Sequence, residues 1–223
     1  MSLNKQDCES TGAGFMASHA NQFDNLRNVI KQHFERYSNE GKLCDEELLS
    51  VLNGKAGALI VSREVVSTQQ YADMLYSLAL LNYEAASYDQ SARLVDGALK
   101  IREEAGGPRA DLLLDFELLV LSYNNRGRFG EAESAAHSWL RMAEDEFGVD
   151  HPYIGKVTFC LAQIYRKQGR KVEAEQMFLR SLSTYAKTNT LDSADASVTR
   201  TAYGDFLRVT GRIEEAKQIE LND

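Results

Sequence analysis

Proline, cysteine and long apolar runs are all scarce in this sequence. The 223 residues include 2 prolines, so long uninterrupted helices are permitted. The 3 cysteines (Cys8, Cys44 and Cys160) form no CxxC pair, which indicates reduced thiols rather than a disulfide framework. No apolar run reaches the roughly 18 residues of a membrane helix, and the N-terminus lacks a signal region. We therefore expect no membrane insertion and a cytoplasmic location.

The sequence also lacks a surplus of basic residues. It has 33 Asp and Glu against 25 Lys and Arg, for a net charge of −8. General nucleic-acid binding needs a basic surface and is therefore not expected. The charge is uneven, because residues 1–150 carry a net −10 and residues 151–223 a net +2. Two interpretations stay open, namely ordinary variation along solvated faces and an acidic first part followed by a mildly basic pocket.

Motifs for catalysis or metal binding are missing as well. The four histidines, at positions 19, 33, 137 and 151, lie far apart, and neither an HExxH motif nor an EF-hand loop is present. The string NGKAG (53–57) lacks the other residues of a phosphate-binding loop. The sequence predicts no catalytic residue, no metal site and no cofactor, and hence a protein that is not an enzyme.

Three similar strings are the main positive feature. YNNRGRFGEAE, YRKQGRKVEAE and LRVTGRIEEAK place glycine at Gly127, Gly169 and Gly211, a spacing of 42 residues. Such a period is typical of stacked helix pairs. Glycine suits the left-handed backbone at the end of a helix. An earlier pair has Ala85-Ala86-Ser87 in this place, so we expect its turn to be made differently.

The hydrophobic spacing predicts eight regular helices. They are expected at 69–85, 88–105, 110–125, 129–147, 153–167, 171–187, 193–209 and 213–221. Small residues should let paired helices approach closely, at positions Ala79, Ala162 and Gly204 in the first helices, with Val120 a looser fit, and Ser91, Ala132, Ala174 and Ala216 in the second. We expect residues 1–18 to be a flexible tail and residues 67–223 to form about four helix pairs. Residues 19–66 should form N-terminal helices, as a degenerate repeat or a cap, with breaks at Asn53-Gly54 and Gly57.

The order of small residue, aromatic residue, glycine and alanine in these pairs resembles that of tetratricopeptide repeats. The 42-residue period and the strings FGVDHP (147–152) and ALKIREEAG (98–106) resemble kinesin light chains. The resemblance covers residues 68–221. It implies an all-α fold, a right-handed superhelical stack of antiparallel helix pairs whose first helices line a concave groove.

Three residues near the third pair have predicted structural roles. Trp139 stands where the family usually has alanine, and we expect it to fill the core, with an exposed partner anchor as the alternative. Gly155 is expected to make room beside Trp139. His151 is expected to stabilise its turn.

The resemblance predicts a groove that binds a peptide. Its candidate residues combine amides, cations and one aromatic side chain: Asn124, Asn125, Lys156, Phe159, Gln163, Arg166, Lys167 and Arg208. Amides can bond a peptide backbone, while Lys and Arg can hold carboxylates. The leading interpretation is an adaptor for a partner peptide, possibly acidic. The alternatives are a scaffold that self-associates through Trp139 or the C-terminal end, as a homo-oligomer, and a regulatory domain of a larger enzyme or complex. An equal interpretation is that the eight candidate residues are ordinary exposed polar residues.

Overall fold

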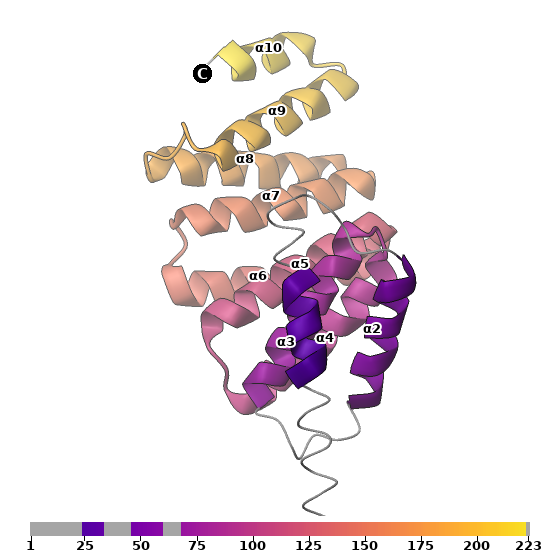
Figure 1. Ribbon diagram of the computed structural model, residues 1–223. Coiled ribbons are helices and arrows are strands. Elements are labelled where there is room, and N and C mark those ends of the chain that lie inside the picture. The colour runs from indigo at the N-terminus through magenta and orange to yellow at the C-terminus, as the bar shows by residue number, and fades with distance from the viewer. Residues whose placement is uncertain (1–23, 34–45, 60–67, 222–223) are drawn as a thin grey trace, which may run out of the picture. The chain divides into compact units, whose positions relative to one another are not determined.

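The computed structural model describes residues 24–33, 46–59 and 68–221, and every element in these ranges is an α-helix (Figure 1). The predicted tail at residues 1–18 lies outside the described residues. The chain divides into two compact units, which we call unit 1 (up to Leu118) and unit 2 (from Leu119). The division falls inside one helix, α5.

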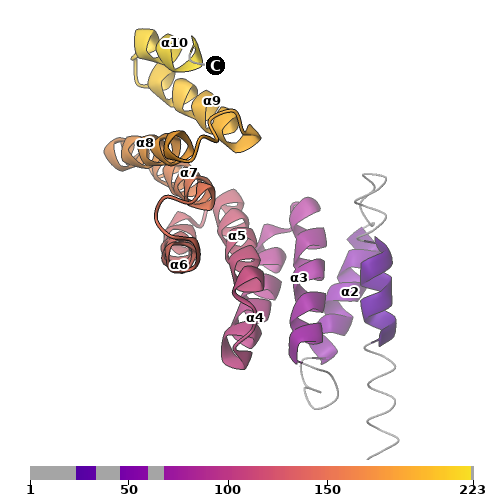
Figure 2. The same ribbon diagram turned by 90° about the vertical axis from the view of Figure 1, so that its left-hand side faces the viewer.

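The predicted helices of the regular part are confirmed to within one residue at each end. After a helix at residues 24–33 the structure contains α2 (Glu46–Leu59), α3 (Thr68–Glu84), α4 (Tyr88–Ala105), α5 (Arg109–Arg126), α6 (Phe129–Phe147), α7 (Pro152–Lys167), α8 (Lys171–Lys187), α9 (Ala194–Val209) and α10 (Ile213–Leu221). Consecutive helices pack as pairs, α3 with α4 in unit 1 and α7 with α8 and α9 with α10 in unit 2 (Figure 2). The predicted fold class, helix pairs packed in sequence, is thereby confirmed.

The positions predicted to hold small residues are buried in every pair. Ala79, Ala162 and Gly204 in the first helices, and Ala132, Ala174 and Ala216 in the second, are all inaccessible to solvent or nearly so. Larger neighbours such as Leu78, Leu161 and Phe178 are fully buried around them. This interleaving of large and small side chains gives the close packing that stabilises each pair.

The predicted break in α2 is wrong, because the helix runs through Asn53, Gly54 and Gly57 to Leu59. Two glycines in a helix cost about 1 kcal/mol each relative to alanine. Tertiary contacts offset this, since Leu49 and Leu52 are buried and α2 packs against α3. The amides of Asn53 and Asn82 also exchange hydrogen bonds of 3.0 and 2.9 Å, which satisfies the fully buried Asn82.

One turn geometry recurs after the first helix of successive pairs. Gly127, Gly169 and Gly211 have φ between 76° and 86°. In each case the next residue donates its backbone N–H to the carbonyl five residues back, as Arg170 does to Tyr165 at 2.9 Å. The α3–α4 turn uses the same geometry, with Ala86 at φ 57° and Ser87 bonded to Asn82 at 2.8 Å. The expectation of a different turn there is therefore wrong.

We predict that Ala86→Gly stabilises the chain by about 0.5–1 kcal/mol. A left-handed conformation strains any residue with a Cβ, and relief of that strain should exceed the added entropy of glycine in the unfolded chain. The free energy of unfolding in urea measures the effect. Ala85→Gly is the matched control, because Ala85 does not have a positive φ, and it should destabilise. Equal effects of the two substitutions would contradict the assigned strain.

A buried ion pair connects α4 and α5 within unit 1. The Arg102 guanidinium donates to Asp115 and, at 2.8 Å, to Asp73 on α3. Arg102 is 4% exposed and Asp115 is fully buried, whereas Asp73 is half exposed. Burial raises the pKa of Asp115 to about 6 against the opposing effect of Arg102. The carboxylate therefore depends on Arg102 to remain charged in the core.

Candidate functional site

The candidate peptide-binding residues all lie in unit 2, on α5, α7 and α9. Asn124 and Asn125 are in the last turn of α5, and Arg208 is in the last turn of α9. Five residues lie on α7, at positions that share one side of the helix. We call this set the α7 face: Lys156, Phe159, Gln163, Arg166 and Lys167.

The α7 face is set apart by the burial pattern of the helix. Ile154, Val157 and Leu161 are fully buried, as α7 packs against α6 and α8 and also contacts α9. Every member of the α7 face is half-buried or exposed. The 16 residues of α7 contain three positive charges and no Asp or Glu. The face is therefore positively charged in a chain whose net charge is −8.

Several candidate residues interact with their own neighbours. Arg166 Nε donates to Gln163 Oε1 at 2.9 Å, and the Phe159 ring lies 6.2 Å from the buried Phe178 ring. On α9, Arg208 pairs with Asp205 at 3.0 Å. The Lys167 ammonium lies 6.0 Å from the Phe129 ring centroid. These contacts orient the side chains, and Arg166 and Lys167 remain exposed.

Two groups carry an electrostatic or hydrogen-bonding deficit that a ligand could remove. Burial and, second, the positive charge of Arg166 lower the pKa of Lys167, because like charges disfavour each other. The Asn124 side-chain oxygen is buried and has no hydrogen-bond partner among the described residues. A bound carboxylate would stabilise the two cations, and a peptide N–H could satisfy the amide.

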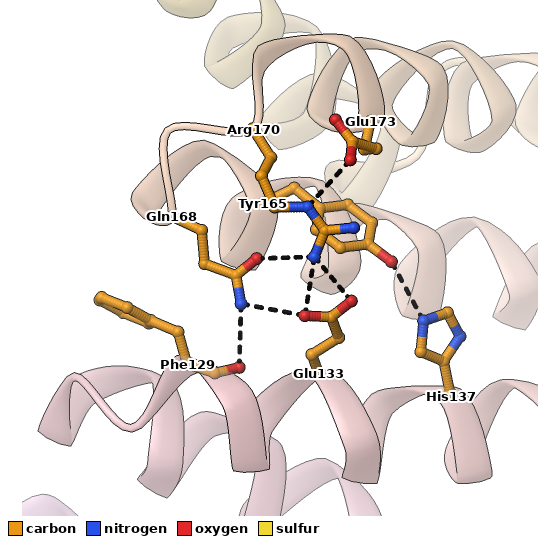
Figure 3. Close-up of polar contacts among 7 residues, drawn as sticks. All are labelled: Phe129, Glu133, His137, Tyr165, Gln168, Arg170 and Glu173. Carbon is orange, nitrogen blue, oxygen red and sulfur yellow. Dashed lines mark hydrogen bonds and ion pairs between the residues drawn. The ribbon is translucent and has the colours of Figure 1, made fainter.

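A polar network joins α6 to the α7–α8 turn, as Figure 3 shows. Arg170 Nη1 bonds both carboxylate oxygens of Glu133, at 2.8 and 2.9 Å, and its Nε bonds Glu173 at 2.9 Å. Gln168 donates to Glu133 at 3.0 Å, and the Tyr165 ring lies 4.3 Å from the guanidinium. Burial opposes ionisation of Glu133, but the bonds from Gln168 and Arg170 outweigh it and lower its pKa.

The same ion pair recurs one repeat later, between Arg212 and Glu175 at 2.5 Å. Each pair joins the second helix of one repeat to the turn of the next. The sequence carried a signal for this that was missed, because Arg and Glu recur with the 42-residue period just as glycine does. The network holds successive repeats together.

The predicted role of His151 is confirmed, as its Nδ1 accepts the Tyr153 backbone N–H at 3.2 Å and caps α7. Trp139 is fully buried, so the core prediction is confirmed and the exposed anchor is wrong. The space beside Gly155 is filled by Tyr185, since a Cβ there would lie 2.6 Å from its ring. The expected contact of Gly155 with Trp139 stays a prediction, and the nearest ring to Gly155 is that of Tyr185.

No metal site and no membrane span can be assigned in the described part of the chain. No group of three or more His, Cys, Asp or Glu is placed there to hold a metal ion. None of the described helices is long and apolar enough to cross a membrane.

Sequence and structure comparisons agree with this architecture. Residues 113–187 match the tetratricopeptide repeat family, so this segment of the chain has the sequence of tetratricopeptide repeats. No curated protein matches the sequence significantly.

Solved structures with a similar fold include kinesin-light-chain-like repeat proteins. A variant form of a putative kinesin light chain from Podosopora anserina, with nearly identical TPR-like repeats, has a TM-score of 0.68 at 14% identity, covering 92% of this chain and 93% of that one. BtubC (BKLC) from P. vanneervenii has a TM-score of 0.62 at 20% identity, covering 93% and 90%. At these identities the likeness establishes the fold alone.

Proposed function

We propose that this chain is a non-catalytic adaptor that binds an extended peptide segment of a partner protein along the α7 face. Tetratricopeptide repeats are in general protein-interaction modules. The observation that carries the proposal is the composition of this face, which has three cations, an amide and an aromatic ring on one side of α7 and no acidic residue. Asn124, Asn125 and Arg208, on α5 and α9, complete the proposed site.

The chemistry favours an acidic segment. Arg and Lys form charge-assisted hydrogen bonds with carboxylates, which are stronger than neutral ones. Burial and then the charge of Arg166 lower the pKa of Lys167, and a carboxylate near both cations would relieve their mutual repulsion. Amides such as Gln163 and Asn124 can bond the peptide backbone, and Phe159 offers an apolar contact. A regulatory role in a larger enzyme or complex, and a cytoplasmic location, stay predictions.

The proposal predicts that Arg166→Glu/Arg208→Glu weakens peptide binding by about 100-fold or more, because charge-assisted hydrogen bonds contribute about 1.5–3 kcal/mol each and two are removed. The ligands are peptides selected on the wild-type chain from a random display library, and fluorescence anisotropy gives their dissociation constants. Arg141→Glu/Lys171→Glu makes the same change in charge on exposed sites of α6 and α8 and is the matched control. Equal affinity of the wild-type and Arg166→Glu/Arg208→Glu chains would remove the assignment.

A further inference from the structure

An uncharged row of exposed side chains runs along α8 on a side that the proposed function does not use. We call this the α8 row: Val172, Gln176, Leu179, Ser183 and Ala186. Val172 is 67% exposed and Leu179 is 48% exposed, and the other three are exposed as well. Two large apolar side chains on an otherwise uncharged row differ from the mixed charged surface expected of a solvated helix.

The repeat itself shows that the fold does not require this row. One repeat earlier, on α6, the corresponding exposed or partly exposed positions hold glycine and polar residues: Gly130, Ser134, His137, Arg141 and Glu144. One repeat later, on α10, the positions matching Val172 and Gln176 hold Glu214 and Gln218. The same backbone environment therefore accepts polar side chains, and the apolar residues of α8 need another explanation.

We propose that the α8 row is the contact surface for a second copy of this chain, with the two α8 helices antiparallel. The row is nearly symmetric about Leu179, since Val172 and Ala186 lie seven residues to either side. A two-fold axis at Leu179 places Leu179 against its own copy and Val172 against the small Ala186. It also places the Gln176 amide beside the Ser183 hydroxyl. Such self-complementarity is what an isologous dimer interface requires.

The charges around the row favour a copy of the same chain. Along its flanks, Glu173, Glu175 and Arg180 are paired within the chain, with Arg170, Arg212 and Glu144 respectively. At one end Lys171 has no ion-pair partner among the described residues. At the other end Lys187 pairs with Asp150 at 2.9 Å, and both are well exposed.

In the antiparallel arrangement, Lys171 of one copy faces the Asp150–Lys187 pair of the other copy. The Asp150 carboxylate is then available to the Lys171 ammonium. Unit 2 as a whole is almost neutral, with 14 Lys and Arg against 15 Asp and Glu, whereas residues 1–118 carry 11 against 18. Long-range repulsion between copies is therefore smallest when they meet through unit 2. The contact is small, so we infer a weak dimer that forms at high concentration.

Sedimentation velocity on the full chain, from about 10 µM to about 1 mM, tests this inference. The wild type should shift toward a dimer, and Val172→Glu/Leu179→Glu should weaken association by about tenfold or more, because two charges would be buried without partners. Ser134→Glu/Gln218→Glu is the matched control. It adds the same charge at the α6 and α10 positions equivalent to Gln176 and should leave the dimer unchanged.

Cross-linking tests the two-fold geometry separately. With Cys8, Cys44 and Cys160 changed to serine, Leu179→Cys should form a disulfide-linked dimer under mild oxidation, because the axis brings this position against itself. Ser134→Cys, on the equivalent row of α6, should stay monomeric. Any of three results would overturn the inference. The wild type could stay monomeric throughout the concentration range, the two double glutamate variants could weaken dimerisation equally, or Leu179→Cys could fail to cross-link.

Discussion

Replacing Arg102 by methionine is expected to lower the free energy of unfolding by about 3–5 kcal/mol, the usual effect of removing one partner from a buried ion pair. Methionine keeps much of the apolar stem but leaves the fully buried Asp115 carboxylate without its cation. Asp73 also loses its bond to Arg102, but that carboxylate is 47% exposed and water can replace the bond. Urea denaturation followed by circular dichroism measures the effect.

The loss should depend on pH in a defined direction. Burial raises the pKa of Asp115 to about 6, above its unfolded value of 3.8. A raised folded-state pKa favours the folded chain fully below pH 3.8, and this contribution is lost as the pH rises through 6. Without Arg102 the pKa of Asp115 should rise further, because its nearest positive charge is gone. The difference between variant and wild type should therefore be larger at pH 7.5 than at pH 5.

A double variant separates the lost pair from general damage to the core. Arg102→Met/Asp115→Leu removes both charges, and apolar replacements of a buried pair are often neutral. It should regain most of the stability that Arg102→Met loses. Relative to wild type it should gain stability between pH 5 and pH 7.5, because it lacks the carboxyl whose ionisation destabilises the folded wild type in that range. If the double variant were as unstable as Arg102→Met at both pH values, the stranded carboxylate would not be the cause.

Trp139→Ala is expected to cost about 3–5 kcal/mol, the range for truncating a large buried aromatic side chain. Trp139 is fully buried, and its ring contacts Tyr153 edge to face with centroids 5.9 Å apart. Its Nε1 donates to the Tyr153 hydroxyl at 3.3 Å. The ring centroid of Tyr153 in turn lies 5.3 Å from that of Phe147, whose ring stacks on the capping residue His151. Removing the indole therefore leaves a cavity and loosens the start of α7.

Circular dichroism in urea gives the stability of this variant, because the chain has 1 tryptophan and its fluorescence is lost with the substitution. Trp139→Phe is the control. It keeps an aromatic ring against Tyr153 and should lose less than half as much. Hydrogen exchange should show faster exchange of amides in the first turn of α7 for Trp139→Ala. A loss below about 1 kcal/mol would contradict the assigned core position.

Periodic features of the fold could be predicted from the sequence, because they depend on local chemistry repeated along the chain. The boundary at Gly169, for example, follows from the left-handed turn that glycine permits. Ala86 was missed since alanine adopts that conformation only at a cost. The continuous α2 was missed for a similar reason, because its glycines are tolerated where Leu49 and Leu52 are buried.

Contacts between residues distant in sequence were harder to predict. Gly155 was expected to accommodate a large neighbour, but nothing in the spacing identified Tyr185, which lies 30 residues later on α8. For the Arg170–Glu133 ion pair, the sequence shows only that Arg and Glu recur with the repeat. It does not show that they meet, since side-chain direction depends on packing. For the candidate site, the sequence identified charged and amide residues on α7. The structure adds their exposure and the unpaired oxygen of Asn124.

Photo-cross-linking to a bound peptide tests the central claim most directly. A benzoylphenylalanine at Gln163, in the middle of the α7 face, should cross-link a display-selected peptide, and excess unlabelled peptide should prevent it. The same group at Gln176, which is exposed on α8, should not cross-link the peptide. Cross-linking from position 176 and none from position 163 would contradict the account.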